Sequence, residues 1–283
     1  MSASTHHTAP TQFVEAAGIR FAYRRFGKTG GVPLVLLQHF TGNMDNWDPA
    51  VTDGFARDSE VILFNNAGIS TTNGETPTSV AGMARDAAAF IDALGLTSCD
   101  LLGFSLGGMV AQQLALDRPR LVRKLILAGT GPQGGDGMDK FSPEVKSIFF
   151  EKKYVPGDLI WLDLFFSRSD ASQATGRAFL ERMRARKDGR DPLGDLKVAQ
   201  AQLTAVAEWG APRSNRFAYL QGITQPALVI NGNDDIILPT INSYHLAQNL
   251  PNAELIIYPD SNHGSQYQSP ERFVAHAGMF LRA

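Results

Sequence analysis

Residues 100–119 read DLLGFSLGGMVAQQLALDRP, and this stretch decides the fold class. The apolar run DLL predicts a buried strand, and MVAQQLALDRP has apolar positions at helical spacing. Between them lies the pattern G-x-S-x-G with Ser105 at its centre. A strand, a sharp turn and a helix are the context in which this pattern exposes a serine hydroxyl at the end of a sheet. Such a tight turn needs small residues beside the serine.

The predicted turn also suits Ser105 to attack a carbonyl carbon. Ser105 precedes a helix N-terminus, whose partial positive charge favours the oxyanion formed in such an attack. We therefore expect the backbone N–H of Leu106 to point at that oxyanion. The alternative is that the pattern arises by chance and Ser105 only caps a helix, but the strand and the helix on either side favour the catalytic interpretation.

A serine hydroxyl is a weak nucleophile until a base removes its proton, so the motif predicts a histidine further along the chain. His263, in YPDSNHGSQYQSP, lies between the last predicted strand and the last predicted helix. That position is a loop at the carboxyl end of the sheet, where ligands bind in open α/β sheets. His6 and His7 lie in a polar N-terminal tail, and His245 and His276 lie in helix patterns that suggest surface or packing positions.

Two neighbouring aspartates, Asp234 and Asp235, directly follow the predicted strand in ALVINGNDDIILP. Either carboxylate is able to accept the second imidazole N–H of His263. The resulting order of serine, aspartate and histidine along the chain is the order found in α/β sheets with this serine motif.

From residue 11 onward, short apolar runs alternate with longer helical patterns, which predicts an α/β fold with a mostly parallel sheet covered on both faces. The first two strands lie a few residues apart around Gly18 and read as an antiparallel hairpin. The eight predicted strands are Gln12 to Glu15, Ile19 to Arg25, Leu34 to Leu37, Val61 to Phe64, Asp100 to Leu102, Lys124 to Ala128, Ala227 to Asn231 and Glu254 to Tyr258.

The alternation stops after Gly129, and residues 132–213 have helical, amphipathic patterns without a convincing strand. Serine, proline or aspartate begins each of the clearest helical stretches, as capping requires. We therefore predict a core made of residues 1–131 and 214–283 and a helical segment of residues 132–213, called the helical insertion below.

The composition excludes several classes of function. The chain has 283 residues with 28 acidic and 26 basic side chains, and no basic run suggests nucleic-acid binding. The opening MSASTHHTAP lacks the apolar stretch of a secretory signal, and no later segment is long and apolar enough to span a membrane, so we expect a soluble, cytoplasmic protein. The single cysteine, Cys99, is expected to be a small core residue. Both a monomer and a homo-oligomer are compatible with the sequence.

These features together resemble the α/β-hydrolase fold family, in particular the branch of small bacterial esterases, lactonases, C–C bond hydrolases and cofactor-free haloperoxidases. The similarity runs from about Val14 to Leu281 and is weakest in the helical insertion. The resemblance implies that this insertion, after the sixth strand, caps the active site. The branch usually has its acid in a glycine-x-x-aspartate pattern with proline four residues beyond, which selects Asp235 through Gly232 and Pro239 and leaves Asp234 as the fallback.

The resemblance also implies a second oxyanion donor in the loop after the third strand, usually at histidine-glycine followed by an apolar residue. This chain reads Leu37-Gln38-His39-Phe40-Thr41-Gly42, so Gln38 and His39 stand where histidine and glycine are expected, and Phe40 would supply the backbone N–H. Glycine is normally used where backbone passes closely, so the loop departs from the family pattern. Two roles stay open for His39: contact with substrate or influence on protonation, or packing beside Trp47.

The predicted activity is acyl transfer on a carboxylic ester or lactone of a small, largely apolar substrate. Ser105 attacks the carbonyl, His263 takes its proton, Asp235 stabilises the imidazolium, and water then cleaves the acyl-enzyme. No metal or organic cofactor is required. Aromatic and aliphatic side chains of the insertion are candidate walls of an apolar pocket: Phe149, Phe150, Trp161, Leu162, Phe165 and Phe166.

Other functions compete with this prediction. Relatives that use an aspartate nucleophile, the haloalkane dehalogenases and epoxide hydrolases, are disfavoured because the residue here is Ser105. A cofactor-free haloperoxidase or perhydrolase and a C–C bond hydrolase would use the same three residues. A small-molecule receptor on a hydrolase scaffold would keep them without fast turnover. A purely structural protein would require the three residues to coincide by chance.

Overall fold

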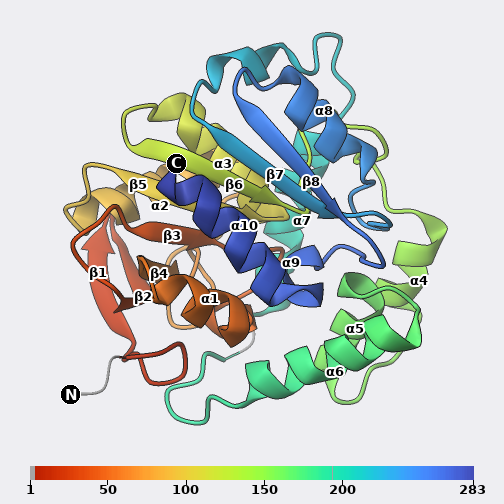
Figure 1. Cartoon of the computed structure of the whole chain (residues 1–283), viewed down its shortest axis with the longest axis horizontal. Helices are drawn as coiled ribbons and strands as arrows, with labels where there is room; N and C mark the ends of the chain where they lie inside the picture. Colours follow the sequence, from red (N-terminus) through yellow and green to blue (C-terminus); the bar gives the residue numbers. More distant parts are fainter. Residues whose placement is uncertain (1–3, 193) are drawn as a thin grey trace.

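The computed structural model describes residues 4–192 and 194–283. Eight strands form one sheet in the order β1-β2-β4-β3-β5-β6-β7-β8 (Figure 1). β2 pairs antiparallel with both β1 and β4, and the remaining neighbours are parallel. The α/β-hydrolase fold and each of the eight predicted strands are thus confirmed. The strands are β1 (Gln12–Ala16), β2 (Ile19–Gly27), β3 (Leu34–Leu37), β4 (Glu60–Phe64), β5 (Cys99–Phe104), β6 (Val122–Ala128), β7 (Ala227–Gly232) and β8 (Ala253–Tyr258).

Helices cover both faces of the sheet. In Figure 1, α1 (Pro49–Ala56) and α10 (Pro270–Arg282) lie in front of it, while α2 (Val80–Ala93) and α3 (Leu106–Asp117) lie behind. Helix α8 (Ile241–Asn249) contributes the Leu246 side chain to the same core as α2 and α3. The short elements are η1 (Met44–Asn46) and α9 (Ser265–Gln268).

The central strands separate two hydrophobic cores. Alternate residues of β3 face opposite sides, because successive side chains of a strand point to opposite faces of the sheet. Leu34 and Leu36 join the core under α1 and α10, and Val35 and Leu37 join the core under α2 and α3. Every residue of β3 is therefore buried, as expected of a parallel strand covered on both faces. Cys99 is buried at the start of β5, as predicted, and burial raises the pKa of its thiol to about 12.

The helical insertion joins β6 to β7 and lies beside the carboxyl end of the sheet. Its α4, α5 and α6 form the lower right of Figure 1. Side-chain caps begin three of its helices, at Ser142, Ser169 and Asp195, each accepting a backbone N–H three residues on. The elements are α4 (Pro143–Phe150), η2 (Gly157–Leu159), α5 (Ile160–Phe165), α6 (Asp170–Arg184) and α7 (Leu196–Gly210), and η3 (Ala218–Gly222) follows.

The N-terminal segment is not the polar tail that the sequence suggested. His6 is buried, with its Nδ1 2.9 Å from Thr52 Oγ1 and its backbone N–H donating to Asp53 Oδ1 at 2.7 Å. Arg186 of the insertion donates to the carbonyl oxygens of His6 and Ala9, both at 3.0 Å. A distant arginine thus supplies the donors that fold this segment onto the core. Burial lowers the pKa of His6 to about 3.

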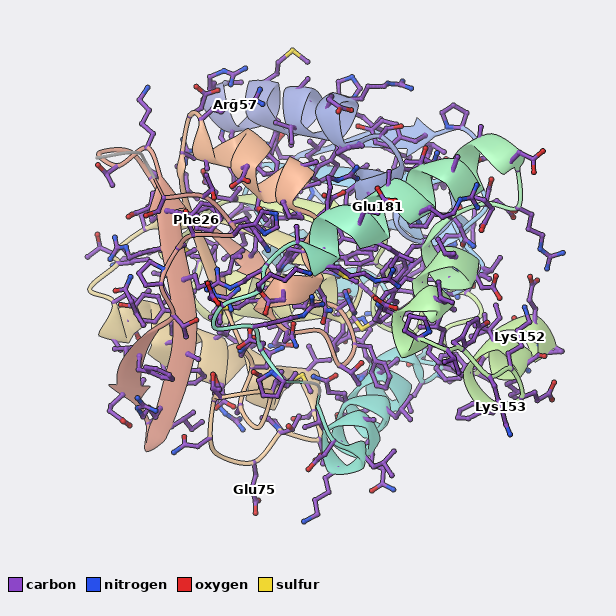
Figure 2. The ribbon with its side chains drawn as sticks, turned by 90° about the horizontal axis from the view of Figure 1, so that it is seen from below. Phe26, Arg57, Glu75, Lys152, Lys153 and Glu181 are labelled. Atoms are coloured by element: carbon purple, nitrogen blue, oxygen red, sulfur yellow. The ribbon has the colours of Figure 1, made fainter. Side chains whose placement is uncertain are left out.

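Seen from below, the helix that carries Glu181 crosses the centre of the view, and charged side chains such as Glu75 and Lys153 project outward (Figure 2). None of the helices within residues 4–192 and 194–283 has the length and apolar character needed to cross a membrane.

Candidate active site

Ser105 occupies the turn between β5 and α3. Its backbone has φ 55° and ψ −119°, which is unusual for a residue with a side chain and is kept only where the surroundings enforce it. The glycines of the motif permit this turn. A Cβ on Gly103 would lie 2.4 Å from the carbonyl oxygen of Gly107, and a Cβ on Gly107 would lie 2.0 Å from that of Leu37. Both glycines are therefore required by close backbone approach.

A buried carboxylate holds His263 in one orientation. His263 Nδ1 lies 2.8 Å from Asp235 Oδ2, and both side chains are buried. The other oxygen of Asp235 accepts the backbone N–H groups of Ile237 and Leu238, each at 2.9 Å. Since Nδ1 faces a carboxylate, it carries the proton, and Nε2 is left as a proton acceptor. Asp234, the fallback from the sequence, is exposed.

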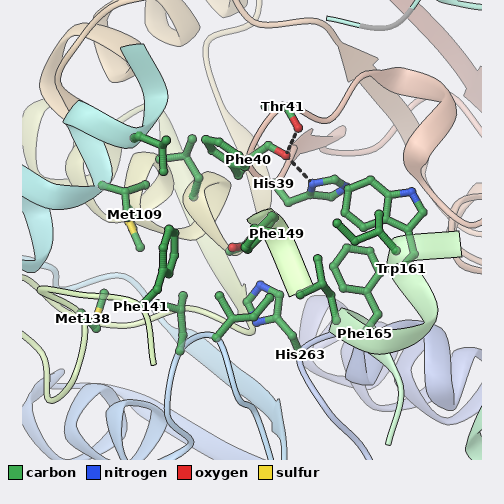
Figure 3. A pocket seen from close by; sticks show the side chains of 18 of the residues that line it. His39, Phe40, Thr41, Met109, Met138, Phe141, Phe149, Trp161, Phe165 and His263 are labelled. Atoms are coloured by element: carbon green, nitrogen blue, oxygen red, sulfur yellow. Dashed lines mark hydrogen bonds between the residues drawn. The ribbon is translucent and has the colours of Figure 1, made fainter. Parts of the chain in front are cut away.

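Ser105 and His263 line one cavity of about 330 Å³ between the sheet and the helical insertion (Figure 3). The Ser105 hydroxyl has no hydrogen-bond partner within residues 4–192 and 194–283. Hydrogen bonds between a catalytic hydroxyl and its base are commonly long before substrate binds and shorten only in the complex. Side chains from the insertion and from the core close the rest of the wall, most of them apolar: His39, Phe40, Thr41, Leu106, Met109, Gly137, Met138, Lys140, Phe141, Phe149, Ile160, Trp161, Leu164, Phe165, Leu203, Val206, Ile237 and Leu238.

Three of the side chains proposed from the sequence do not line this cavity. The prediction for Phe166 is wrong because α5 ends at Phe165 and the backbone of Phe166 is extended. Its ring therefore turns away from the cavity and packs on the ring of Phe179, with the two centroids 5.6 Å apart. Leu162 packs against Gly176 of α6. Phe150 is 70% exposed. Phe149, Trp161 and Phe165 do line the cavity.

Two backbone N–H groups at the cavity have no acceptor among the described residues. In the part of the chain that the structure describes, the N–H groups of Phe40 and Leu106 donate to no protein group, and both residues line the cavity. Leu106 is the first residue of α3, where N–H groups have no partner within the helix. Two such donors near a nucleophile are suited to bind a developing oxyanion.

The Gln38 side chain bridges the loop of residues 38–43, where the family's histidine-glycine pair is missing. Gln38 Nε2 donates to the carbonyl oxygen of Asn43 at 3.0 Å, and Gln38 Oε1 accepts the N–H of His39 at 2.9 Å. The side chain therefore spans the loop and takes the neighbouring N–H, while that of Phe40 stays free. Gly42 leaves room for it, since a Cβ there would lie 2.4 Å from Gln38 Cγ.

His39 is part of the cavity wall, and it is neutral. Its Nδ1 lies 2.9 Å from the carbonyl oxygen of Phe40, so Nδ1 carries the proton and the buried Nε2 is an acceptor (Figure 3). Burial lowers its pKa to about 3 although the bond to Phe40 opposes this shift. The ring packs against Phe104, Trp161 and Phe165, while Trp47 packs against Phe104 and Tyr267. Of the two roles left open for His39, packing beside Trp47 is not the arrangement found, since the ring lies in the cavity wall against Trp161 and Phe165 of the insertion.

Sequence reasoning missed two kinds of site residue. Met109 was within reach, because it lies four residues after Ser105 on α3 and so on the same face of the helix. The contact of Gln202 with the loop was not: Gln202 Oε1 accepts the backbone N–H of Thr41 at 2.6 Å across 161 residues of sequence. No local pattern distinguishes Gln202 from Gln200, the other glutamine of α7.

Comparisons with known proteins concern the sequence and the fold of the whole chain. The sequence model of the alpha/beta hydrolase fold family matches residues 32–270. A solved alpha/beta hydrolase fold protein from Chitinophaga pinensis is 40% identical, with a TM-score of 0.92, covering 98% of this chain and 99% of that one. A structure titled as Est816, an N-acyl homoserine lactone degrading enzyme, is 27% identical, with a TM-score of 0.72 and coverage of 95% and 100%. A curated relative from Pseudomonas savastanoi pv. phaseolicola, named "Putative carbamate hydrolase RutD", is 27% identical over 89% of this chain and 94% of its own length.

Proposed function

Because the chain belongs to the α/β-hydrolase fold family, we propose that it is a serine hydrolase that cleaves a carboxylic ester or lactone of a small, largely apolar substrate. The observation that carries the proposal is the shared cavity wall of Ser105 and His263, with His263 Nδ1 on the buried carboxylate of Asp235. A nucleophile, a base and a group that orients the base are the three parts that acyl transfer by serine needs.

In the proposed first step, Ser105 Oγ bonds to the carbonyl carbon of the substrate while His263 Nε2 takes the hydroxyl proton. Asp235 remains ionised and stabilises the imidazolium, since its two oxygens already accept three N–H groups. The imidazolium then gives its proton to the leaving alkoxide. Water, deprotonated by the same nitrogen, attacks the acyl-enzyme; the bond between Ser105 Oγ and the acyl carbon then breaks, the imidazolium returns its proton to Ser105 Oγ, and the acid is released. The proposed steps use no metal or organic cofactor.

The backbone N–H groups of Phe40 and Leu106 are the proposed oxyanion hole. Within the described residues neither N–H has a protein acceptor, which supports the proposal because no existing hydrogen bond has to break when charge develops on the carbonyl oxygen. Positioned donors of this kind contribute roughly 10²- to 10³-fold each to turnover in serine hydrolases.

The cavity supports a small apolar substrate. A volume of about 330 Å³ is near the lower end for ligand pockets, and methionine, phenylalanine, leucine and isoleucine side chains make most of its wall. His39 is neutral and so adds no charge to this wall, whose lining also includes Lys140. The likeness to the Est816 structure supports the inclusion of lactones among the candidate substrates.

The test is hydrolysis of p-nitrophenyl esters of increasing acyl length and of a set of small lactones by the wild type and by Ser105→Ala. We expect the wild type to hydrolyse short and medium apolar acyl groups and Ser105→Ala to lose at least about 10³-fold in kcat/KM. Equal turnover by both proteins would contradict the proposal. So would wild-type inactivity on all esters and lactones combined with peracid formation from acetate and peroxide, or with loss of a coloured ring-cleavage dienone acid.

A further inference from the structure

The loop that carries Phe40 holds an unfavourable backbone conformation one residue further on. Thr41 has φ 57°, and a β-branched residue at positive φ is a genuine outlier. Such a conformation persists only when surrounding contacts enforce it. The question is which contacts do so here.

Hydrogen bonds hold both ends of the peptide group that joins Phe40 to Thr41. Its carbonyl oxygen accepts from His39 Nδ1 at 2.9 Å and from Thr41 Oγ1 at 2.8 Å, as Figure 3 shows. Its N–H donates to Gln202 Oε1 at 2.6 Å. The first two contacts come from within the loop, and Gln202 alone of these partners comes from the helical insertion.

The position of Gln202 favours a role in holding the loop rather than in contacting substrate. Its side chain is fully buried on α7, and it is absent from the cavity wall, which α7 reaches through Leu203 and Val206. Its Nε2 has no partner within residues 4–192 and 194–283. The bond to Thr41 is thus the polar contact that the Gln202 side chain makes, and the bond fixes the plane of the peptide that follows the proposed oxyanion donor.

We propose that Gln202 is a positioning residue that couples the helical insertion to the oxyanion hole. With α7 docked, Gln202 holds the Phe40–Thr41 peptide and keeps the N–H of Phe40 directed into the cavity. When the contact is lost, Thr41 relaxes from its positive φ, and the Phe40 donor moves with it. The inference rests on the proposed function, because it assigns Gln202 an effect on the stabilisation of an oxyanion.

The insertion also contacts the site near His263, through a hydrogen bond that a side-chain substitution does not remove. The carbonyl oxygen of Phe165 accepts the N–H of Gly264, next to His263, at 3.0 Å. That contact is between backbone groups. Gln202 instead contacts the Phe40–Thr41 peptide through its side chain, so a side-chain substitution is able to test this contact.

The experiment compares Gln202→Met, which keeps the shape without an acceptor, with Gln202→Glu, which keeps an oxygen facing Thr41 whether or not it is protonated. The control is Gln200→Met, at an exposed position on the same helix. With the best ester of the panel, we expect Gln202→Met to lose roughly 10- to 100-fold in kcat with KM within about twofold of wild type. We expect Gln202→Glu to retain kcat within about threefold and Gln200→Met to match the wild type.

A second measurement separates positioning from a general loss of structure. A trifluoromethyl ketone adds to the serine as a tetrahedral oxyanion, so its affinity should fall in Gln202→Met by the same factor as kcat/KM. Unchanged kcat in Gln202→Met, or equal losses in the Met and Glu variants, would overturn the inference. The proposed function would still stand if Ser105→Ala were inactive while the wild type was active. If the wild type and Ser105→Ala did not differ in activity, the proposed function would be refuted instead. Faster amide hydrogen exchange at Thr41 in Gln202→Met would then still report on the contact between Gln202 and Thr41.

Discussion

The two loops that meet at the cavity are held in place by different means. The turn around Ser105 is fixed by close backbone packing: Gly103 approaches Gly107, and Gly107 approaches the carbonyl oxygen of Leu37. The loop of residues 38–43 is instead fixed by side-chain hydrogen bonds from Gln38, from His39 and from Gln202 of the insertion. The position of the proposed nucleophile therefore depends on close backbone packing around one motif, whereas that of the proposed oxyanion donor at Phe40 depends on side-chain hydrogen bonds, one of which comes from far along the chain.

The largest effect is expected at the group that orients the base. Asp235→Asn removes the negative charge facing His263 Nδ1 and favours the wrong imidazole tautomer, so we expect kcat to fall roughly 10³- to 10⁴-fold. The neighbouring Asp234→Asn is the matched control, because that carboxylate is exposed, and its activity should stay within about twofold of wild type. The measurement is kcat and KM of the wild type and of both variants with one ester. Equal kinetics for the two variants would reject Asp235 as the partner of His263.

The next effect tests the steric side of the comparison. Gly107→Ala puts a Cβ about where it would clash with the Leu37 backbone, 2.0 Å from its oxygen, so the helix or β3 must shift. We expect a loss of roughly 1–3 kcal/mol in the free energy of unfolding, as in overpacked cores, and about 100-fold in kcat/KM from displacement of the serine.

Gly31→Ala is the control for Gly107→Ala, since Gly31 is exposed and nothing lies within 4 Å of the added Cβ. Urea unfolding and ester kinetics on both proteins make the comparison. If Gly107→Ala behaved like Gly31→Ala, the steric account of the turn would be wrong.

The smallest effect concerns the loop and the pH dependence of stability. His39 has a pKa of about 3 in the fold, against 6.5 when exposed, because burial disfavours its charged form. Its contribution is complete above pH 6.5 and is lost as the pH falls toward 3, since the unfolded chain then binds the extra proton. Between pH 7 and pH 5 the loss is roughly 2 kcal/mol at about 1.4 kcal/mol per pH unit.

His39→Asn keeps a donor near the Phe40 carbonyl and removes the titration. Urea unfolding at pH 7 and pH 5 should therefore show a smaller acid destabilisation in this variant than in the wild type, by roughly 2 kcal/mol. The same acid loss in both proteins would mean that His39 is charged or exposed in the fold.

The difference between the locally packed turn at Ser105 and the loop of residues 38–43 also explains which features the sequence was able to predict. The turn at Ser105 was predictable because its constraints lie within a few residues, between a strand and a helix that have strong patterns of their own. The positions of Asp235 and His263 followed from their places after the strands β7 and β8, at the edge of the sheet where Ser105 also lies.

The remaining features depend on long-range contacts or on local geometry that no pattern encodes. Burial of His6 requires donors from Arg186, 180 residues away, and the direction of Phe166 depends on where α5 ends. The contact between Gln202 and Thr41 exists only once the insertion is packed on the core. Neither the composition nor the spacing of residues predicts these long-range contacts.

The most direct test of the central claim is covalent labelling of the nucleophile. The wild type is treated with a fluorophosphonate, and the modified peptide is identified by mass spectrometry, with Ser105→Ala as the control. We predict one adduct on Ser105, loss of ester hydrolysis in proportion to labelling, and no adduct in the variant. An adduct on another residue, or ester hydrolysis that survives complete labelling of Ser105, would contradict the assignment of this serine as the nucleophile.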